Sequence, residues 1–195
     1  MQKTDNWMVL LGTGILLISL VGSALGGQPD NGPPPPPGGD YHFMLTTVSQ
    51  TITGSGQENS QKDYNITVNY TNLATFSATL TWQDEPANRP GQTNQPDELG
   101  LTAASPAGEA RSDKKTASQG EVTLDFAFPV TEKTAASKAS KAGQGSWTVT
   151  VEVGPCGDHT PLLPDPLGLR TTPDSGNAFT LEITYSYFMK MKGAM

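Results

Sequence analysis

The sequence predicts an all-β fold, an antiparallel β-sandwich, preceded by one N-terminal transmembrane helix and a polyproline linker. Three observations predict it. Beyond residue 40, apolar residues recur at every second position in six or seven short runs, which is the spacing of half-buried strands. Glycine, proline, asparagine and aspartate separate these runs, and no convincing helical pattern interrupts them. Ahead of them, Met8–Leu25 contains no charged residue.

A helix over residues 8–25 would be about 27 Å long, close to the hydrocarbon thickness of a bilayer. We therefore expect a signal-anchor in the cell membrane, a single pass with residues 1–7 in the cytoplasm and the C-terminal domain outside the cell. Lys3 before the apolar run and acidic residues after it favour this orientation. The alternative is a secretory signal peptide that is cleaved near Ala24 and leaves a secreted domain. The length of the run favours the anchor.

The next segment, Gly26–Asp40, is predicted to be a linker because glycines flank five consecutive prolines, Pro33–Pro37. Five prolines form a stiff polyproline II rod of about 15 Å, which would hold the following domain away from the membrane. That domain is expected to span residues 41–190, and residues 191–195 would form a C-terminal tail.

The predicted strands share one feature, an apolar face on alternate residues. They are Tyr41–Leu45, Tyr64–Tyr70, Phe76–Trp82, Val122–Phe128, Trp147–Val153 and Phe179–Tyr187, with Leu99–Ser105 as a weaker candidate. Two long segments interrupt the pattern, 131–146 and 154–176. The first is small, polar and rich in alanine, and is expected to form a loop rather than a short helix. The second contains many prolines and is expected to be irregular.

Charge and cysteine content exclude several classes of protein. The formal net charge of −7 over 195 residues argues against nucleic acid as a partner. The single cysteine, Cys156, excludes an intramolecular disulfide and leaves either a free thiol or an intermolecular bridge. The chain has two histidines and neither a G-x-S-x-G nor an H-E-x-x-H motif, so it is not expected to be an enzyme.

Two groups of residues could bind a metal. Asp84 and Glu85 lie at one strand end, and Asp97 and Glu98 follow the next loop, so four carboxylates could converge on calcium, which prefers oxygen ligands. The alternative is that these residues are only the solvated ends of two strands. This alternative is favoured because the spacing of the four carboxylates matches no calcium-binding loop motif. Cys156, Asp158 and His159 are also close in sequence, but they lack the further ligands that a closed zinc site requires. No other cofactor is expected.

Two N-x-T sequons occur in one predicted strand, at Asn65 and Asn69. Alternation places both asparagines on the face opposite Tyr64, Ile66 and Val68. The sequence therefore predicts glycosylation sites on the polar face of this strand.

Several motifs resemble those of pre-peptidase C-terminal (PPC) and proprotein convertase P-type domains. They are Thr79–Pro86 (TLTWQDEP), Asp97–Leu101 (DELGL), Ser105–Glu109 (SPAGE), Gly145–Val151 (GSWTVTV) and the closing strand Phe179–Tyr187. The resemblance implies a jelly-roll-like, non-catalytic sandwich of the kind that is appended to secreted proteases. The sequence departs from the pattern in having no attached protease domain. It also has Gly100 where those families often have a second aspartate, a departure that weakens the case for a calcium site inherited with the resemblance.

These observations predict a non-enzymatic, membrane-anchored extracellular β-sandwich that binds or scaffolds a protein or glycan of the cell envelope. The alternative is a structural subunit of a surface filament, sheath or membrane complex. In that case the N-terminal helix would pack against copies of itself, giving a homo-oligomer, or against partner helices.

Overall fold

The computed structural model describes residues 41–87, 89–164 and 171–192. The predicted anchor, linker and last three residues lie outside these ranges. In the part of the chain that is described, no helix has the length and apolar character needed to cross a membrane.

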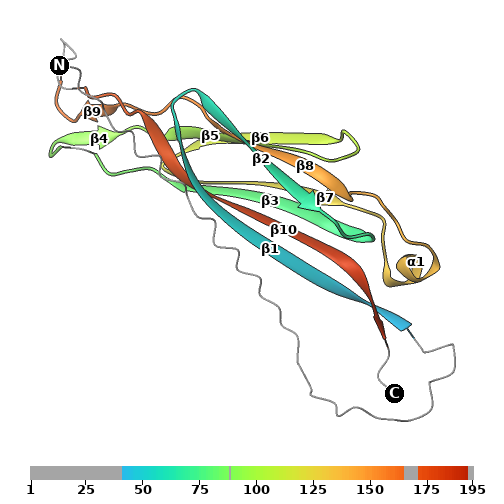
Figure 1. Ribbon diagram of the computed structural model, residues 1–195. Helices are drawn as coiled ribbons and strands as arrows, with labels where there is room; N and C mark the ends of the chain where they lie inside the picture. The colour runs from blue at the N-terminus through green and yellow to red at the C-terminus, as the bar shows by residue number, and fades with distance from the viewer. Residues whose placement is uncertain (1–40, 88, 165–170, 193–195) are drawn as a thin grey trace, which may run out of the picture.

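Two four-stranded antiparallel sheets pack face to face, which confirms the predicted all-β, antiparallel architecture (Figure 1). The first sheet has the order β1 (Tyr41–Gln57), β10 (Gly176–Lys192), β3 (Leu73–Gln83) and β7 (Gln119–Ala127). The second has the order β2 (Ser60–Val68), β8 (Gly145–Val153), β5 (Asp97–Ala104) and β6 (Ala110–Ala117). A small two-stranded sheet joins β4 (Gln92–Asn94) to β9 (His159–Pro161). Along the chain, the eight long strands alternate between the two large sheets except at the β5–β6 pair.

The core lies between the large sheets and is formed by the alternating residues that the sequence indicated. Trp147 is fully buried and stacks on Phe76, with ring centroids 3.8 Å apart. Phe126 packs edge-on against the same indole at 4.9 Å. The indole Nε1 donates a hydrogen bond of 2.9 Å to the Gly143 carbonyl, so the polar atom of this core residue is satisfied.

Leu99–Ser105, the weaker strand candidate, contributes to a central strand of the second sheet. In β5, Leu99, Leu101 and Ala103 are buried, and the strand pairs with β6 on one side and β8 on the other. No pattern in the sequence indicated β6, because nearly all of its side chains are exposed and no apolar alternation marks it.

Two expectations about apolar side chains in the predicted strands are wrong. Tyr41 and Leu45 do not face the core but are 56% and 52% exposed, because this end of β1 extends beyond the sandwich. Tyr70 is also exposed and follows the end of β2, where it stacks on Tyr187 with ring centroids 4.0 Å apart.

The expectation that the 131–146 segment contains no helix is also wrong. It forms a short helix, α1 (Glu132–Ser137). The Thr131 hydroxyl accepts a hydrogen bond from the Thr134 backbone N–H, which caps this helix.

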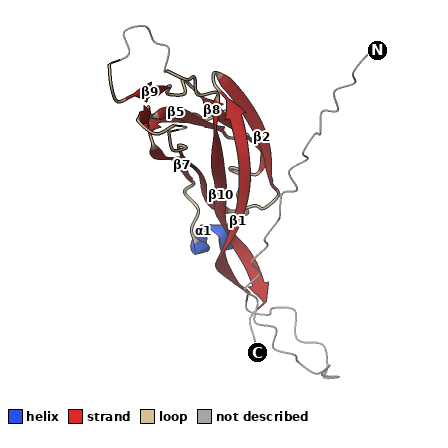
Figure 2. Ribbon diagram, turned by 90° about the vertical axis from the view of Figure 1, so that its left-hand side faces the viewer, coloured by secondary structure: helices blue, strands red, loops and turns tan. Residues whose placement is uncertain are grey.

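The longest strands, β1 and β10, give the sandwich two distinct poles. They pair along their whole length, from Tyr41 opposite Lys192 to Gln57 opposite Gly176. Pairing of β10 with β3 ends at Tyr187, so the last residues of β10 and the first of β1 form a two-stranded ribbon that runs past α1 (Figure 2). We call this end the chain-end pole. The opposite end, which carries β4 and β9, is called the acidic pole for the residues described below (Figure 1).

Candidate metal centre

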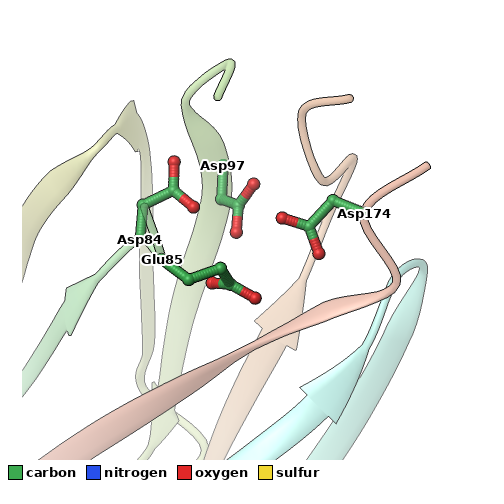
Figure 3. Close-up of side chains that lie close together, drawn as sticks. All are labelled: Asp84, Glu85, Asp97 and Asp174. Carbon is green, nitrogen blue, oxygen red and sulfur yellow. The ribbon is translucent and has the colours of Figure 1, made fainter. Parts of the chain in front are cut away.

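Four carboxylates meet at the acidic pole. Asp84 and Glu85 directly follow β3, Asp97 is the first residue of β5, and Asp174 lies just before β10. One oxygen of each lies within 4.8 Å of an oxygen of every other. Figure 3 shows the four side chains pointing toward a common space from three separate segments. We call this set the acidic cluster.

The acidic cluster includes three of the four residues that the sequence suggested for calcium. Glu98 is not among them, because neighbouring side chains of a strand point to opposite faces and Asp97 takes the inner one. Glu98 instead accepts hydrogen bonds from Lys114 Nζ at 3.0 Å and from Thr116 Oγ1 at 3.4 Å, on the outer face.

Sequence reasoning missed Asp174 because it lies in the proline-rich 154–176 segment, for which no strand was predicted. The only sequence signal is a turn-like Pro-Asp-Ser-Gly before the closing strand. The structure brings Asp174 to the acidic cluster because β10 lies beside β3 in the first sheet, so the start of β10 is at the same end as the close of β3.

Hydrogen bonds fix part of the acidic cluster. Asp97 is fully buried, and its two oxygens accept hydrogen bonds of 2.8 Å from the Gly157 backbone N–H and from Asn177 Nδ2. Asn94, from β4, donates through Nδ2 to Asp84 Oδ1 at 2.6 Å. The Gly176 N–H donates to Asp174 Oδ1 at 3.3 Å. These contacts orient the carboxylates, but none of the donors carries a positive charge.

The electrostatics of the acidic cluster disfavour its fully ionised form. Burial raises the pKa of the Asp84 carboxyl to about 6, and repulsion from the other three carboxylates adds to the rise. Burial also raises the pKa of Asp97, although its hydrogen bonds from Gly157 and Asn177 oppose this. The ion pairs found among the described residues, Arg111 with Glu109 and Lys114 with Glu98, do not include the acidic cluster. The arrangement is therefore suited to bind a cation through oxygen atoms.

Cys156, Asp158 and His159 are not brought together as a set of ligands within the described chain. Asp158 is exposed, whereas His159 is 2% exposed and its backbone pairs with Thr172. Cys156 is a free cysteine, 7% exposed, that packs with the core. Burial raises the pKa of its thiol to about 12, and the nearby Asp97 and Asp174 add to this. An intermolecular bridge through Cys156 would require the surrounding segment to open.

Both sequon asparagines are exposed, but Asn69 lies just beyond the strand in which the sequence placed it. Asn65, in β2, and Asn69, just after it, are both exposed, while Ile66 and Val68 between them are buried. Attached glycan would therefore extend away from the core at both positions.

Comparisons with known proteins identify no family. No family model matches the chain, and no curated protein matches it. Among solved structures, a chain from the Bacillus endospore appendages described as "a novel family of disulfide-linked pili" has a TM-score of 0.32 and 10% identity. The match covers 74% of this chain and 91% of the appendage chain. A chain of Desmodium yellow mottle tymovirus has a TM-score of 0.36 and 9% identity, covering 87% of this chain and 99% of its own. Structural similarity this weak does not indicate a function for this chain.

Proposed function

We propose that the protein is a non-enzymatic, membrane-anchored extracellular domain that presents its acidic pole to a protein or glycan of the cell envelope. The observation that carries this proposal is the pairing of Tyr41 with Lys192, which places the start of the described chain at the chain-end pole. The predicted linker joins the domain at Tyr41. A membrane attachment there leaves the acidic pole, with β4 and β9, at the far end of the sandwich (Figure 1). Loops held on a rigid sandwich are common binding surfaces.

The strand order supports a finer assignment of the fold. Two four-stranded sheets whose strands alternate along the chain have the winding of an eight-stranded jelly roll, a fold that occurs in many non-catalytic proteins. We infer that the sandwich belongs to this class. The resemblance to PPC and P-type domains stays a prediction.

Surface labelling of intact cells tests the proposed orientation. Thr93→Cys places a thiol on β4 at the acidic pole, and Gln2→Cys places one in the predicted cytoplasmic segment, each in a Cys156→Ser background. A membrane-impermeant maleimide should label Thr93→Cys in intact cells and Gln2→Cys only after the cells are permeabilised. Labelling of Gln2→Cys in intact cells, or recovery of a domain that lacks residues 1–24 from the medium, would contradict the proposal.

A photo-crosslinking amino acid at the same position tests partner binding. The proposal expects a discrete crosslinked species from Thr93 in native membranes. The matched control is Thr123, which is exposed on the outer face of β7. Equal crosslinking from both positions would argue against a partner at the acidic pole.

A second candidate function, a structural subunit that assembles with copies of itself, is supported by the edge strand β1. Of the four edge strands of the two large sheets, β2, β6 and β7 each carry charged residues, which discourage strand addition. The 17 residues of β1 contain no Asp, Glu, Lys, Arg or Pro. Such an edge can accept a strand from another molecule.

Sedimentation of the full chain in detergent separates this candidate from the first. Assembly through β1 predicts oligomers that grow with protein concentration and that dissociate when Thr51→Lys charges the β1 edge. Thr123→Lys, on β7, is the matched control and should have no effect. A monomer at all concentrations would remove the second candidate.

A further inference from the structure

Two oxygens of the acidic cluster are enclosed without a hydrogen-bond donor. Asp84 is 9% exposed and Asp174 is 7% exposed. The Oδ2 atom of each is buried and has no hydrogen-bond partner in the part of the chain that the structure describes. Burying a carboxylate oxygen without a donor is costly, more so when no counter-charge is near, and a protein seldom retains two such oxygens side by side unless something binds them. These unpartnered oxygens point to a ligand that supplies positive charge.

Two amide oxygens next to the acidic cluster are also buried without a hydrogen-bond partner among the described residues. Asn177 is 3% exposed, and its Nδ2 donates to Asp97 while its Oδ1 has no partner among the described residues. Asn94 donates through Nδ2 to Asp84, and its Oδ1 is likewise buried and unpartnered within the described chain. Each amide is therefore fixed beside a carboxylate with an oxygen to spare. The donor set is made of oxygens alone, since no histidine or cysteine belongs to the acidic cluster.

We propose that Asp84, Asp97 and Asp174, together with Glu85, bind one calcium ion at the acidic pole. Calcium accepts six to eight carboxylate, carbonyl and water oxygens in a flexible geometry, which suits side chains from three segments. Magnesium demands a smaller octahedral shell and retains its water, so it fits this set less well. The ion connects the end of β3, the start of β5 and the segment before β10. The proposal goes beyond the proposed function, because the membrane orientation does not depend on cation binding.

Titration of the calcium-free full chain in detergent tests this site. Calorimetry is expected to show one calcium per chain with a dissociation constant between about 10⁻⁷ and 10⁻³ M. Saturating calcium is expected to raise the thermal midpoint by about 5 °C, because it binds the folded state only. The same concentration of magnesium, at equal ionic strength, is expected to raise it far less.

Asp174→Asn and Asp84→Asn are the informative variants, with Glu98→Gln as the matched control. Without calcium, both asparagine variants should unfold at the same temperature as the unaltered chain or higher, since each removes a buried charge. With calcium, they should bind at least 10-fold more weakly and lose the rise in midpoint. Glu98→Gln should keep the calcium affinity and the rise in midpoint of the unaltered chain, because Glu98 faces Lys114 and not the acidic cluster. Absence of binding, an equal response to magnesium, or full calcium binding in the Asp84→Asn/Asp174→Asn double variant would overturn the proposal. Each of these results leaves the surface-labelling experiment unaffected.

Discussion

Replacing Trp147 with alanine should lower the free energy of unfolding by about 4 kcal/mol, a large share of the stability of a single domain. The indole is fully buried and contacts Phe76 and Phe126, which belong to the opposite sheet. Truncation leaves a cavity between the two sheets, and it also removes the donor to the Gly143 carbonyl. Chemical denaturation of the full chain in detergent measures the effect.

Trp147→Phe is the matched control. It preserves an aromatic ring next to Phe76 and should cost less than half as much, with the lost hydrogen bond to Gly143 as the main contribution, about 1 kcal/mol. A loss below about 1 kcal/mol for Trp147→Ala would show that this indole is not at the centre of the core.

In calcium-free buffer, the free energy of unfolding should fall between about pH 4.5 and pH 7, and Asp84 should account for about 2 kcal/mol of the fall. The pKa of Asp84 is about 6 in the folded chain, against an ordinary value of 3.8. The folded state therefore binds the proton more tightly than the unfolded state does. The resulting stabilisation is fully present below pH 3.8 and is lost as the pH rises through about 6.

Urea denaturation at about pH 4.5 and pH 7 measures this effect, with Asp84→Asn as the comparison. The asparagine side chain of this variant cannot titrate, so its free energy of unfolding should fall less between the two pH values. At the higher pH, that free energy should exceed the value for the unaltered chain. The raised pKa of Asp97 acts in the same direction and remains in the variant. An identical pH dependence in both proteins would mean that Asp84 is not held in a repulsive, buried setting.

Much of the fold could be predicted because its buried strands have a clear apolar alternation. Phe76–Trp82, Trp147–Val153 and Phe179–Tyr187 are strands with one face in the core, as the period of two indicates. Strand β6 could not be found this way, because an exposed edge strand has no buried face to mark it. Tyr41 and Leu45 follow the same alternation, but they lie on a ribbon that extends beyond the partner sheet.

The acidic cluster could be predicted only in part, for a physical reason. Asp84 and Asp97 flank one loop, so their proximity can be inferred from the sequence alone. The contribution of Asp174 depends on β10 lying next to β3, a long-range pairing that no local pattern reveals. Choosing Asp97 rather than Glu98 requires knowing which face of β5 is buried. Leu99 and Leu101 beyond it, both buried, indicate the same face as Asp97.

Hydrogen exchange of the full chain, with and without calcium, tests most directly the proposal that one calcium ion at the acidic cluster connects three segments of the acidic pole. Calcium should slow exchange at the Gly157 and Gly176 amides, which donate to Asp97 and Asp174. The amides of the ribbon at the chain-end pole should exchange equally fast in both conditions. Exchange that is unchanged at Gly157 and Gly176, or slowed equally at both poles, would contradict the account.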